Sequence, residues 1–247
     1  MKFKTLNIIA LAFCVGFVSC TKEEDPDAPA KGSITGKVRL ADEFGNVITD
    51  HGQVGVVTNT GKDGLTIENG SYLIYGLGDG TYDLTFTKYD YGTYKRFGVP
   101  VTNFANTELS GLDTLGKVST TLITGLVVAF DVDDSTWSFN CNVSPVPDTV
   151  NRRGIRLFFS TNPSLSASDY EYTPGNKWMA TSANGSITGF TTSNFLSNGF
   201  NKGDTVYVIA YGESVYANIY IDPATGKKVF PNVNVENPSN VAMFNLP

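Results

Sequence analysis

The sequence predicts an all-β protein with two consecutive β-sandwich domains after an N-terminal leader. Short runs that alternate apolar and polar residues recur along the chain, and no window of about ten residues has an apolar repeat near the helical period of roughly 3.6. Aromatic residues make up 12% of the chain, which also contains 25 glycines and 11 prolines. That composition is typical of short strands joined by tight turns. With 247 residues, the chain is long enough for one large or two ordinary domains.

Residues 1–19 are typical of a secretory signal. Lys2 and Lys4 precede an apolar stretch that is too short to span a bilayer. The sequence Phe17-Val18-Ser19-Cys20 resembles a lipobox, the site where bacterial lipoproteins are lipidated on cysteine and cleaved just before it. The resemblance implies that acyl chains on Cys20 hold the protein in a membrane, each buried CH₂ contributing about 0.8 kcal/mol. Ordinary signal cleavage, with Cys20 unmodified, is the alternative.

Residues 20–31 are predicted to form an acidic linker. Lys22, Glu23, Glu24 and Asp25 follow the lipidated cysteine, and a run of this kind is typical of a solvated, disordered spacer. The run also resembles the export signal of Bacteroidota surface lipoproteins. That resemblance implies an outer membrane lipoprotein exposed at the cell surface, with the periplasmic face of the same membrane as the alternative.

The charge of the chain limits its partners. The formal net charge is −6, which disfavours nucleic acid and anionic lipid headgroups because both repel a negative surface. The membrane is therefore expected as a partner only through the lipid anchor.

Residues 32–117 are predicted to form the first sandwich. Its clearest strands are expected at 33–40, 54–57, 71–75 and 81–87, separated by turn signals at Phe44–Asn46, Asp63-Gly64, Asn69-Gly70 and Gly78–Gly80. In the last of these strands Tyr82, Leu84 and Phe86 must share the buried face, because alternate residues of a strand face the same side.

Several segments of this unit together resemble a known family. They are Ile34-Thr35-Gly36-Lys37-Val38, Asn69-Gly70-Ser71-Tyr72, Leu77–Leu84 and the pair Tyr91-Gly92. Their order and spacing resemble the carboxypeptidase regulatory-like domain, a small transthyretin-like β-sandwich. The resemblance implies a non-catalytic domain. The family pattern is blurred between Gly45 and Gly70, so the register of that stretch is not predicted.

Residues 118–247 are predicted to form the second sandwich. Strands are expected at Leu122–Val132, Thr136–Ser144, Gly154–Ser160, Gly185–Phe190, Thr205–Tyr211, Val215–Ile221 and Asn240–Leu246. About seven strands separated by Asn-, Gly- and Pro-rich turns suit an immunoglobulin- or fibronectin-III-like sandwich. The likeness is architectural, because no diagnostic motif accompanies it.

The residue types that most catalytic and zinc sites need are scarce. His51 is the single histidine and lies in a polar turn, where a solvent-facing ring is expected, so no Ser-His-Asp triad is predicted. Zinc needs several His or Cys ligands, and the mature chain has only His51 and Cys141 after Cys20 is lipidated. Cys141 lies on the apolar side of an alternating run and is predicted to be a buried core thiol. No enzyme activity and no cofactor are expected.

One acidic turn is a weak candidate for calcium. Asp131, Asp133 and Asp134 gather three carboxylates where a strand ends, and calcium needs only oxygen ligands. The run lacks the spacing of an EF-hand. A charged hairpin turn is the interpretation that we favour.

Aromatic residues are the better indication of recognition. Tyr89, Tyr91 and Tyr94 combine with Asp90 in one loop, and Trp178 lies in loop-like sequence. Such rings have the rigid area and polar tip that suit stacking on a sugar or contact with a partner protein. The alternative is that the rings fold back and cover the end of the sandwich.

Two threonines are candidates for modification. Asp113-Thr114-Leu115 and Asp148-Thr149-Val150 resemble the O-glycosylation acceptor of exported Bacteroidota proteins, as does Asp204-Thr205-Val206. Thr205 opens an expected core strand, so Thr114 and Thr149 are preferred.

These observations predict a lipid-anchored cell-envelope protein that acts as a non-catalytic binding or accessory module of a surface glycan-uptake or adhesion system. The partner is expected to be a glycan or a protein. A pilin-like or scaffold subunit that assembles by strand pairing is the alternative, and a long, unprotected terminal strand would favour it. A hydrolase that uses carboxylates alone is a third hypothesis, which paired carboxylates in a deep pocket would favour.

Overall fold

The computed structural model describes residues 31–179 and 182–247, and Lys31–Pro247 form one compact unit. Residues 1–30 lie outside the described residues. They include the predicted signal peptide, the acidic linker up to Ala30, Cys20 and the export residues Lys22, Glu23, Glu24 and Asp25. Within the described part of the chain, no helix is long and apolar enough to cross a membrane.

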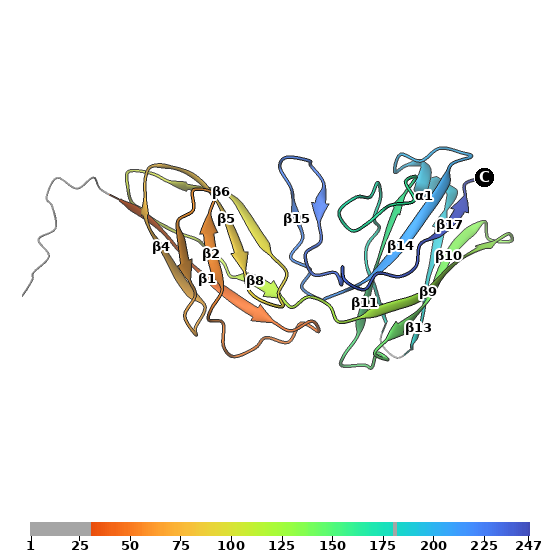
Figure 1. Ribbon diagram of the computed structural model, residues 1–247, viewed down its shortest axis with the longest axis horizontal. Helices are drawn as coiled ribbons and strands as arrows, with labels where there is room; N and C mark the ends of the chain where they lie inside the picture. The colour runs from red at the N-terminus through yellow and green to blue at the C-terminus, as the bar shows by residue number, and fades with distance from the viewer. Residues whose placement is uncertain (1–30, 180–181) are drawn as a thin grey trace, which may run out of the picture. The chain divides into compact units, whose positions relative to one another are not determined.

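The chain is almost entirely β structure, which confirms the predicted fold class (Figure 1). The first part of the chain contains β1 (Gly32–Ala41), β2 (Gly55–Thr58), β3 (Asp63–Leu65), β4 (Ser71–Leu77), β5 (Gly80–Thr87), β6 (Tyr94–Val101), β7 (Asn106–Glu108) and β8 (Asp113–Gly116). The second part contains β9 (Leu122–Asp131), β10 (Thr136–Ser144), β11 (Arg153–Ser160), β12 (Lys177–Met179), β13 (Asn184–Thr191), α1 (Thr192–Leu196), β14 (Thr205–Glu213), β15 (Tyr220–Ile221), β16 (Lys228–Val229) and β17 (Ala242–Asn245).

The first sandwich consists of two sheets that share one hydrophobic core. One sheet has the strand order β4-β1-β7, with β8 also paired to β1, and the other has the order β3-β2-β5-β6. Tyr82, Leu84 and Phe86 all point into the core and are at most 7% exposed, as their alternation predicts. Phe86 packs edge-on against Tyr72 of β4, so rings from both sheets meet in the interior.

Strand β1 changes its parallel neighbour halfway along its length. It pairs with β7 over Ser33–Thr35 and with β8 over Val38–Ala41. Gly36 and Lys37 therefore have a strand neighbour on the β4 side only, where the antiparallel pairing is continuous from Ser33 to Lys37. This gap between β7 and β8 leaves an opening beside β1.

The turn predicted at Asn69-Gly70 is present, whereas the one at Asp63-Gly64 is wrong. Gly70 has a φ of +82°, and a Cβ there would overlap the carbonyl of Val38, so only glycine fits. Asp63-Gly64 lies inside β3, and the chain turns earlier, at Gly61 (φ +81°). Acidic and glycine residues are poor strand formers, which is why the local sequence alone indicates a turn there.

The second sandwich has its own core. Sheets with the orders β13-β10-β9 and β12-β11-β14-β17 pack across it. Trp137, Phe139, Cys141 and Val143 of β10 are all buried, which confirms the predicted core thiol. Burial raises the pKa of the Cys141 thiol to about 11, so the thiol stays protonated and unreactive near neutral pH.

Strands β11 and β14 are buried on both faces. All eight residues of β11 are buried, because loops cover the side of the sheet that faces away from the main core. Phe158, Tyr170, Tyr211, Phe230 and neighbouring apolar residues form a separate cluster on that side. Both strands lie in the middle of their sheet, and the covering loops explain their continuous burial.

Two expectations for the second sandwich need correction. Val215–Ile221 is not one strand: only Tyr220 and Ile221 are extended, and they pair with β16 in a short hairpin. The predicted strand Asn240–Leu246 is shorter, with β17 paired to β14 over Ala242–Asn245. The short helix α1 was not predicted, and its five residues are too few for helical periodicity to be recognised.

The core of the first sandwich leads to a stability prediction. Phe86→Ala should lower the free energy of unfolding by roughly 3–5 kcal/mol, because it removes a fully buried ring and leaves a cavity. Tyr89→Ala is the matched control, since Tyr89 is 90% exposed and its removal should cost under about 0.5 kcal/mol. Denaturant titration of the detergent-solubilised full chain, followed by circular dichroism, measures both. Equal losses in the two variants would contradict the assigned core.

Candidate functional site

The chain passes from the first sandwich to the second through Gly116–Thr121. We call this segment the linker, as distinct from the acidic linker predicted at residues 20–31. Asn232 is fully buried, and its Nδ2 donates to the carbonyl oxygens of Gly116 (2.6 Å) and Lys117 (3.2 Å). The backbone N–H of Ser119 in turn donates to the carbonyl of Asn232 (3.0 Å). Because buried backbone groups need hydrogen-bond partners, these contacts fix the path of the linker.

A segment after β14 holds the same linker from a second side. The Nδ2 of Asn218 donates to the carbonyl of Thr114 (2.6 Å), and its Oδ1 accepts from the N–H of Gly116 (2.9 Å). The hydroxyl of Ser214 donates to the carbonyl of Lys117 (2.6 Å). The second sandwich therefore forms side-chain hydrogen bonds with the backbone at the end of β8, where a neighbouring strand would form backbone hydrogen bonds.

An ion pair closes the junction near Thr120. The carboxylate of Glu43 accepts from Nη1 of Arg153 (3.1 Å), from the backbone N–H of Thr120 (2.7 Å) and from its hydroxyl (2.6 Å). The side chains of Glu43 and Arg153 are 12% and 9% exposed. Three donors on one mostly buried carboxylate connect the β1–β2 loop, the linker and β11.

Gly92 allows the β5–β6 loop to approach the second sandwich closely. Its backbone N–H donates to the carbonyl of Gly116 (3.0 Å), and a Cβ at this position would overlap the amide of Asn232. The close approach of the β5–β6 loop to the second sandwich therefore requires glycine.

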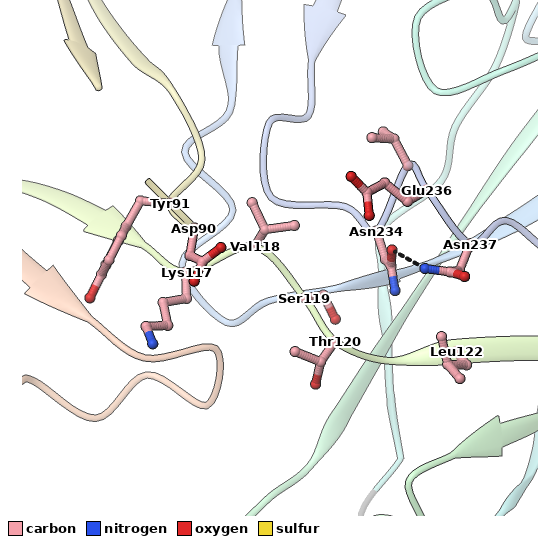
Figure 2. Close-up of a pocket in the computed structure, with 11 residues that line it drawn as sticks. Asp90, Tyr91, Lys117, Val118, Ser119, Thr120, Leu122, Asn234, Glu236 and Asn237 are labelled. Carbon is pink, nitrogen blue, oxygen red and sulfur yellow. Dashed lines mark hydrogen bonds between the residues drawn. The ribbon is translucent and has the colours of Figure 1, made fainter. Parts of the chain in front are cut away.

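A cleft of about 560 Å³ lies over the linker (Figure 2). Its walls come from the β5–β6 loop, the linker, the first residue of β9 and the loop before β17. They consist of Asp90, Tyr91, Lys117, Val118, Ser119, Thr120, Leu122, Asn234, Val235, Glu236 and Asn237. Figure 2 shows Asp90, Tyr91 and Lys117 at one end of the linker, and Asn234, Glu236 and Asn237 at the other.

The polar groups of the cleft are partly fixed and partly free. Asn234 donates to the carbonyl of Thr121 (3.2 Å) and accepts from Nδ2 of Asn237 (3.2 Å), so one amide positions the other. The carboxylates of Asp90 and Glu236 are exposed and make no hydrogen bond or ion pair with any described residue. These two carboxylates and the Oδ1 of Asn237 are therefore available to a ligand.

Tyr91 and Lys117 form the opposite end of the cleft. The Lys117 ammonium lies 5.9 Å from the centre of the Tyr91 ring. Burial raises the pKa of the Tyr91 phenol, and the nearby Asp42 and Asp90 carboxylates raise it further, so the phenol is neutral at physiological pH. This end of the cleft therefore combines a cationic donor with a neutral ring.

The cleft is suited to binding a ligand with many hydroxyl groups. Carboxylates accept hydrogen bonds, amides donate and accept, and an ammonium donates, so vicinal hydroxyls of a ligand find partners of both kinds. Leu122 and Val235 add apolar surface on which carbon–hydrogen groups can rest. Both free carboxylates are exposed, so the deep carboxylate pair expected of the hydrolase hypothesis is not present in this cleft.

The four predicted aromatic site residues do not meet in one place. Tyr91 is 9% exposed and lines the cleft, whereas Tyr89 is 90% exposed and points into solvent. Tyr94 packs on Phe86, with 5.6 Å between ring centres, and Trp178 packs against the backbone of Gly154. The alternative in which the rings cover the sandwich therefore holds for Tyr94, and only Tyr91 belongs to the candidate site.

The acidic turn is an ordinary hairpin turn. The Asp131 Oδ1 accepts from the backbone N–H groups of Asp133 (3.0 Å) and Asp134 (3.3 Å). Across residues 31–179 and 182–247, no group of three or more His, Cys, Asp or Glu side chains is placed to hold a metal ion. The carboxylate of Asp131 stabilises the turn, as the favoured interpretation predicts.

His51 differs from its predicted environment. It is half-buried, and its Nδ1 accepts from the backbone N–H of Leu40 (3.2 Å). The ring therefore caps a strand end inside the first sandwich and does not simply face solvent.

The two candidate glycosylation sites differ in access. The Thr114 hydroxyl is half-buried in β8 and accepts from Nε of Arg39 (3.2 Å). Thr149 is exposed in a turn that Asp148 stabilises by accepting from the N–H groups of Val150 and Asn151. Thr149 is thus the more accessible of the two hydroxyls.

The asparagines that build the site were not predicted from the sequence. Asn232, Asn234 and Asn237 lie in a stretch where Asn alternates with Val, and this pattern suggests an edge strand with its polar side in water. In the structure Asn232 and Asn234 are buried at the junction, together with Val233. The available signal was the density of asparagine in 232–240, because amides satisfy backbone groups where no regular strand can.

Comparisons with known proteins leave the family of this chain open. No protein-family model matches the chain, and no curated protein matches it. A chain of a cohesin–X-dockerin complex from Acetivibrio cellulolyticus is 23% identical over 34% of this chain and 56% of that chain, with a TM-score of 0.30. The match thus spans little more than half of that solved chain.

Two further solved structures show similarly distant likeness. A protein from Bacteroides uniformis, described as a proposed carbohydrate binding protein, is 11% identical over 88% of this chain and all of its own, with a TM-score of 0.34. A Fn3-like protein from Clostridium thermocellum is 18% identical over 51% of this chain and 91% of its own, with a TM-score of 0.26. TM-scores of this size do not identify a shared family or function.

The junction leads to a second stability prediction. Asn232→Ala should lower the free energy of unfolding by about 1–3 kcal/mol, because it removes two hydrogen bonds from a fully buried amide, to the carbonyls of Gly116 and Lys117. Asn59→Ala is the matched control, since Asn59 is exposed in a surface turn and the change should cost under about 0.5 kcal/mol. Hydrogen exchange of the linker amides should also accelerate in Asn232→Ala. Unchanged stability together with unchanged exchange would show that the amide does not hold the linker.

Proposed function

We propose that the protein is a lipid-anchored, non-catalytic glycan-binding module of the cell envelope, and that it binds its ligand in the cleft over the linker. The observation that carries the proposal is that Asp90 at one end of the cleft, and Glu236 and Asn237 at the other, all present free polar atoms to it. Free carboxylates and amides beside apolar patches match the alternating hydroxyl and carbon–hydrogen surface of a sugar ring.

The charge of the cleft supports a neutral ligand. Two carboxylates face one ammonium from Lys117, and the whole chain is acidic, so an anionic ligand would be repelled. A cationic ligand would find only two separated carboxylates, with no described third acidic group placed beside them to form a cation site. Neutral saccharides satisfy the donors and acceptors of the cleft without either penalty.

The rigidity of the junction supports binding without a closing motion. The linker is held by Asn218, Asn232 and the Glu43–Arg153 pair, so the walls of the cleft are already positioned before a ligand arrives. A preformed site does not lose the entropy of ordering its own loops, which matters for a shallow site with few contacts.

The anchor and the location of the protein are part of the same proposal. Lipidation at Cys20 would hold the module at the outer membrane, and the acidic run from Lys22 to Asp25 would direct it to the cell surface. There, a glycan-binding module would serve a glycan-uptake or adhesion system. The strand-pairing alternative has less support, because β17 has only four paired residues at the edge of its sheet.

Binding in the cleft can be tested with polysaccharides. The detergent-solubilised full chain should be retarded in native gels that contain one of four soluble polysaccharides: xylan, mannan, mixed-linkage β-glucan or amylopectin. Glu236→Gln and Asn237→Ala should each weaken retardation by about tenfold, which corresponds to about 1.4 kcal/mol for a lost pair of hydrogen bonds.

Glu68→Gln is the matched control, because Glu68 is an exposed glutamate outside the cleft and the change should have no effect. Retardation that is equal in all three variants and the parent would overturn the assignment of the cleft.

The anchor can be tested by phase partitioning. The full chain expressed in a bacterium that lipidates such proteins should enter the detergent phase of a Triton X-114 separation, whereas Cys20→Ala should remain in the aqueous phase. Cys141→Ala is the control and should still enter the detergent phase, because Cys141 is a buried core residue. Partitioning of Cys20→Ala into detergent would contradict lipidation at that residue.

A further inference from the structure

The outer face of the sheet β4-β1-β7 carries a second arrangement of ligand-binding groups. The register places Tyr75 beside Ser33, Leu73 beside Thr35, and Ser71 beside Lys37 across the β4–β1 pair. Across the β1–β7 pair, Ser33 lies beside Asn106 and Thr35 beside Glu108. Because directly paired residues project from the same face of a sheet, all eight side chains line one solvent-facing surface, which we call the outer face.

The apolar side chains of the outer face are unusually exposed. Tyr75 is 65% exposed and Leu73 is 54% exposed, side by side on one strand. The core of the first sandwich lies on the opposite face and is filled by Tyr72, Ile74 and Leu77 of the same strand. Tyr75 and Leu73 therefore contribute nothing to the core, and their apolar surface remains available to a ligand.

Polar side chains beside Tyr75 are held in a fixed row. The Ser33 hydroxyl donates to Oδ1 of Asn106 (2.9 Å), and Nδ2 of Asn106 donates to the Thr35 hydroxyl (3.2 Å). The second Nδ2 hydrogen and the lone pairs of both hydroxyls remain available. A rigid ring thus lies next to a row of preoriented donors and acceptors.

A cavity of about 470 Å³ opens at one end of this face, where β1 passes from β7 to β8. It is lined by Thr35, Gly36, Lys37, Ser71, Tyr72 and Glu108, together with Leu109, Ser110 and Gly111. Tyr72 is 4% exposed, and its hydroxyl is buried without a hydrogen-bond partner among the described residues. A Cβ on Gly36 would overlap this hydroxyl, so the Tyr72 ring can pack against β1 only because residue 36 is glycine.

We propose that the outer face and this cavity form a second saccharide-binding site. The Tyr75 ring stacks on a sugar ring, Ser33 and Asn106 bind its hydroxyls, and the Tyr72 hydroxyl pairs with a ligand hydroxyl that enters the cavity. Ser71 and Tyr75 are four residues apart on β4, or about 13 Å, so the ligand is an oligosaccharide and not a single sugar.

Charge and edge geometry favour a neutral saccharide over other occupants. Lys37 and Glu108 both line the cavity, and their opposite charges offset each other. An added peptide strand would need a free edge on β4, but the N–H of Ile67 already donates to the carbonyl of Ser71 (3.0 Å) there. The backbone of Gly64 also packs against the carbonyl of Leu73. A ligand beside β4 therefore lies across the face and does not extend the sheet at that edge.

This site shares its ligand class with the proposed cleft but rests on different residues. Its test uses the same detergent-solubilised full chain in native gels containing xylan, mannan, mixed-linkage β-glucan or amylopectin. Tyr75→Ala should weaken retardation by about tenfold or more, because stacking of a ring on a ligand is lost. Tyr75→Phe should retain retardation, and Tyr89→Ala should match the parent because that exposed tyrosine lies outside the site.

Tyr72→Phe separates binding from folding. Removing a buried hydroxyl that has no partner should leave the free energy of unfolding unchanged or higher, whereas retardation should weaken by several-fold. Retardation of Tyr75→Ala and Tyr72→Phe equal to that of Tyr89→Ala would overturn the second site.

The two sites fail separately in this design. Loss of retardation in Tyr75→Ala with none in Glu236→Gln supports the outer face and overturns the cleft, and the reverse result overturns the outer face alone. The absence of retardation of the parent in all four polysaccharides would overturn both.

Discussion

The structure depends on side-chain amides that hold the linker between the two sandwiches. Backbone contacts reach only part of the linker, where Lys117 bridges to Tyr91 and its N–H donates to the carbonyl of Ala41, and the fully buried Asn232 and the half-buried Asn218 add further hydrogen bonds. The Gly116 carbonyl also accepts from the Gly92 N–H, and the Lys117 carbonyl from the Ser214 hydroxyl, so each amide strengthens a shared hydrogen-bond network. The hydrogen bonds that hold the linker also shape the cleft, because linker residues line it.

The apolar cluster that covers β11 and β14 on the side away from the main core holds these amides in place. The chain after β14 must return over the sheet, and Phe230 fixes it there by packing on Phe158 (5.3 Å) and under the guanidinium of Arg156 (4.3 Å). Arg156 also pairs with Glu213 at 2.6 Å. Burial raises the pKa of the Glu213 carboxyl, and Arg156 opposes that rise, so the pair is coupled to the packing around it. Asn232 follows Phe230 by two residues, which connects the outer cluster directly to the linker.

Local alternation in the sequence was enough to predict most of the long strands, but not their order in the sheets and not the junction. Strands β5 and β10 alternate cleanly because their own sandwiches bury every second residue, and both were predicted with the correct buried face. The prediction failed at Val215–Ile221, where Tyr216 and Tyr220 suggest a strand. Their rings instead lie near Arg39 (5.7 Å) and Phe97 (6.1 Å) of the first sandwich. Contacts with a distant segment determine the conformation of residues 215–221, so the periodicity of the segment itself does not predict it. For the same reason only Asp90 and Tyr91 of the cleft, which lie in one loop, were identified in advance.

Rigidity at the junction also bears on how two weak sites act together. A linked pair of sites increases apparent affinity only if one ligand can reach both, and a flexible linker spreads the second site over many positions. Asn232, Asn218 and the Glu43–Arg153 pair hold the linker inside the single compact unit Lys31–Pro247. If both proposed sites bind one ligand, a polysaccharide whose repeat matches their separation would engage both, whereas a shorter oligosaccharide would engage one. Selectivity would then arise from spacing along the ligand, which explains why neither site needs the depth or the enclosed aromatic walls of a high-affinity pocket.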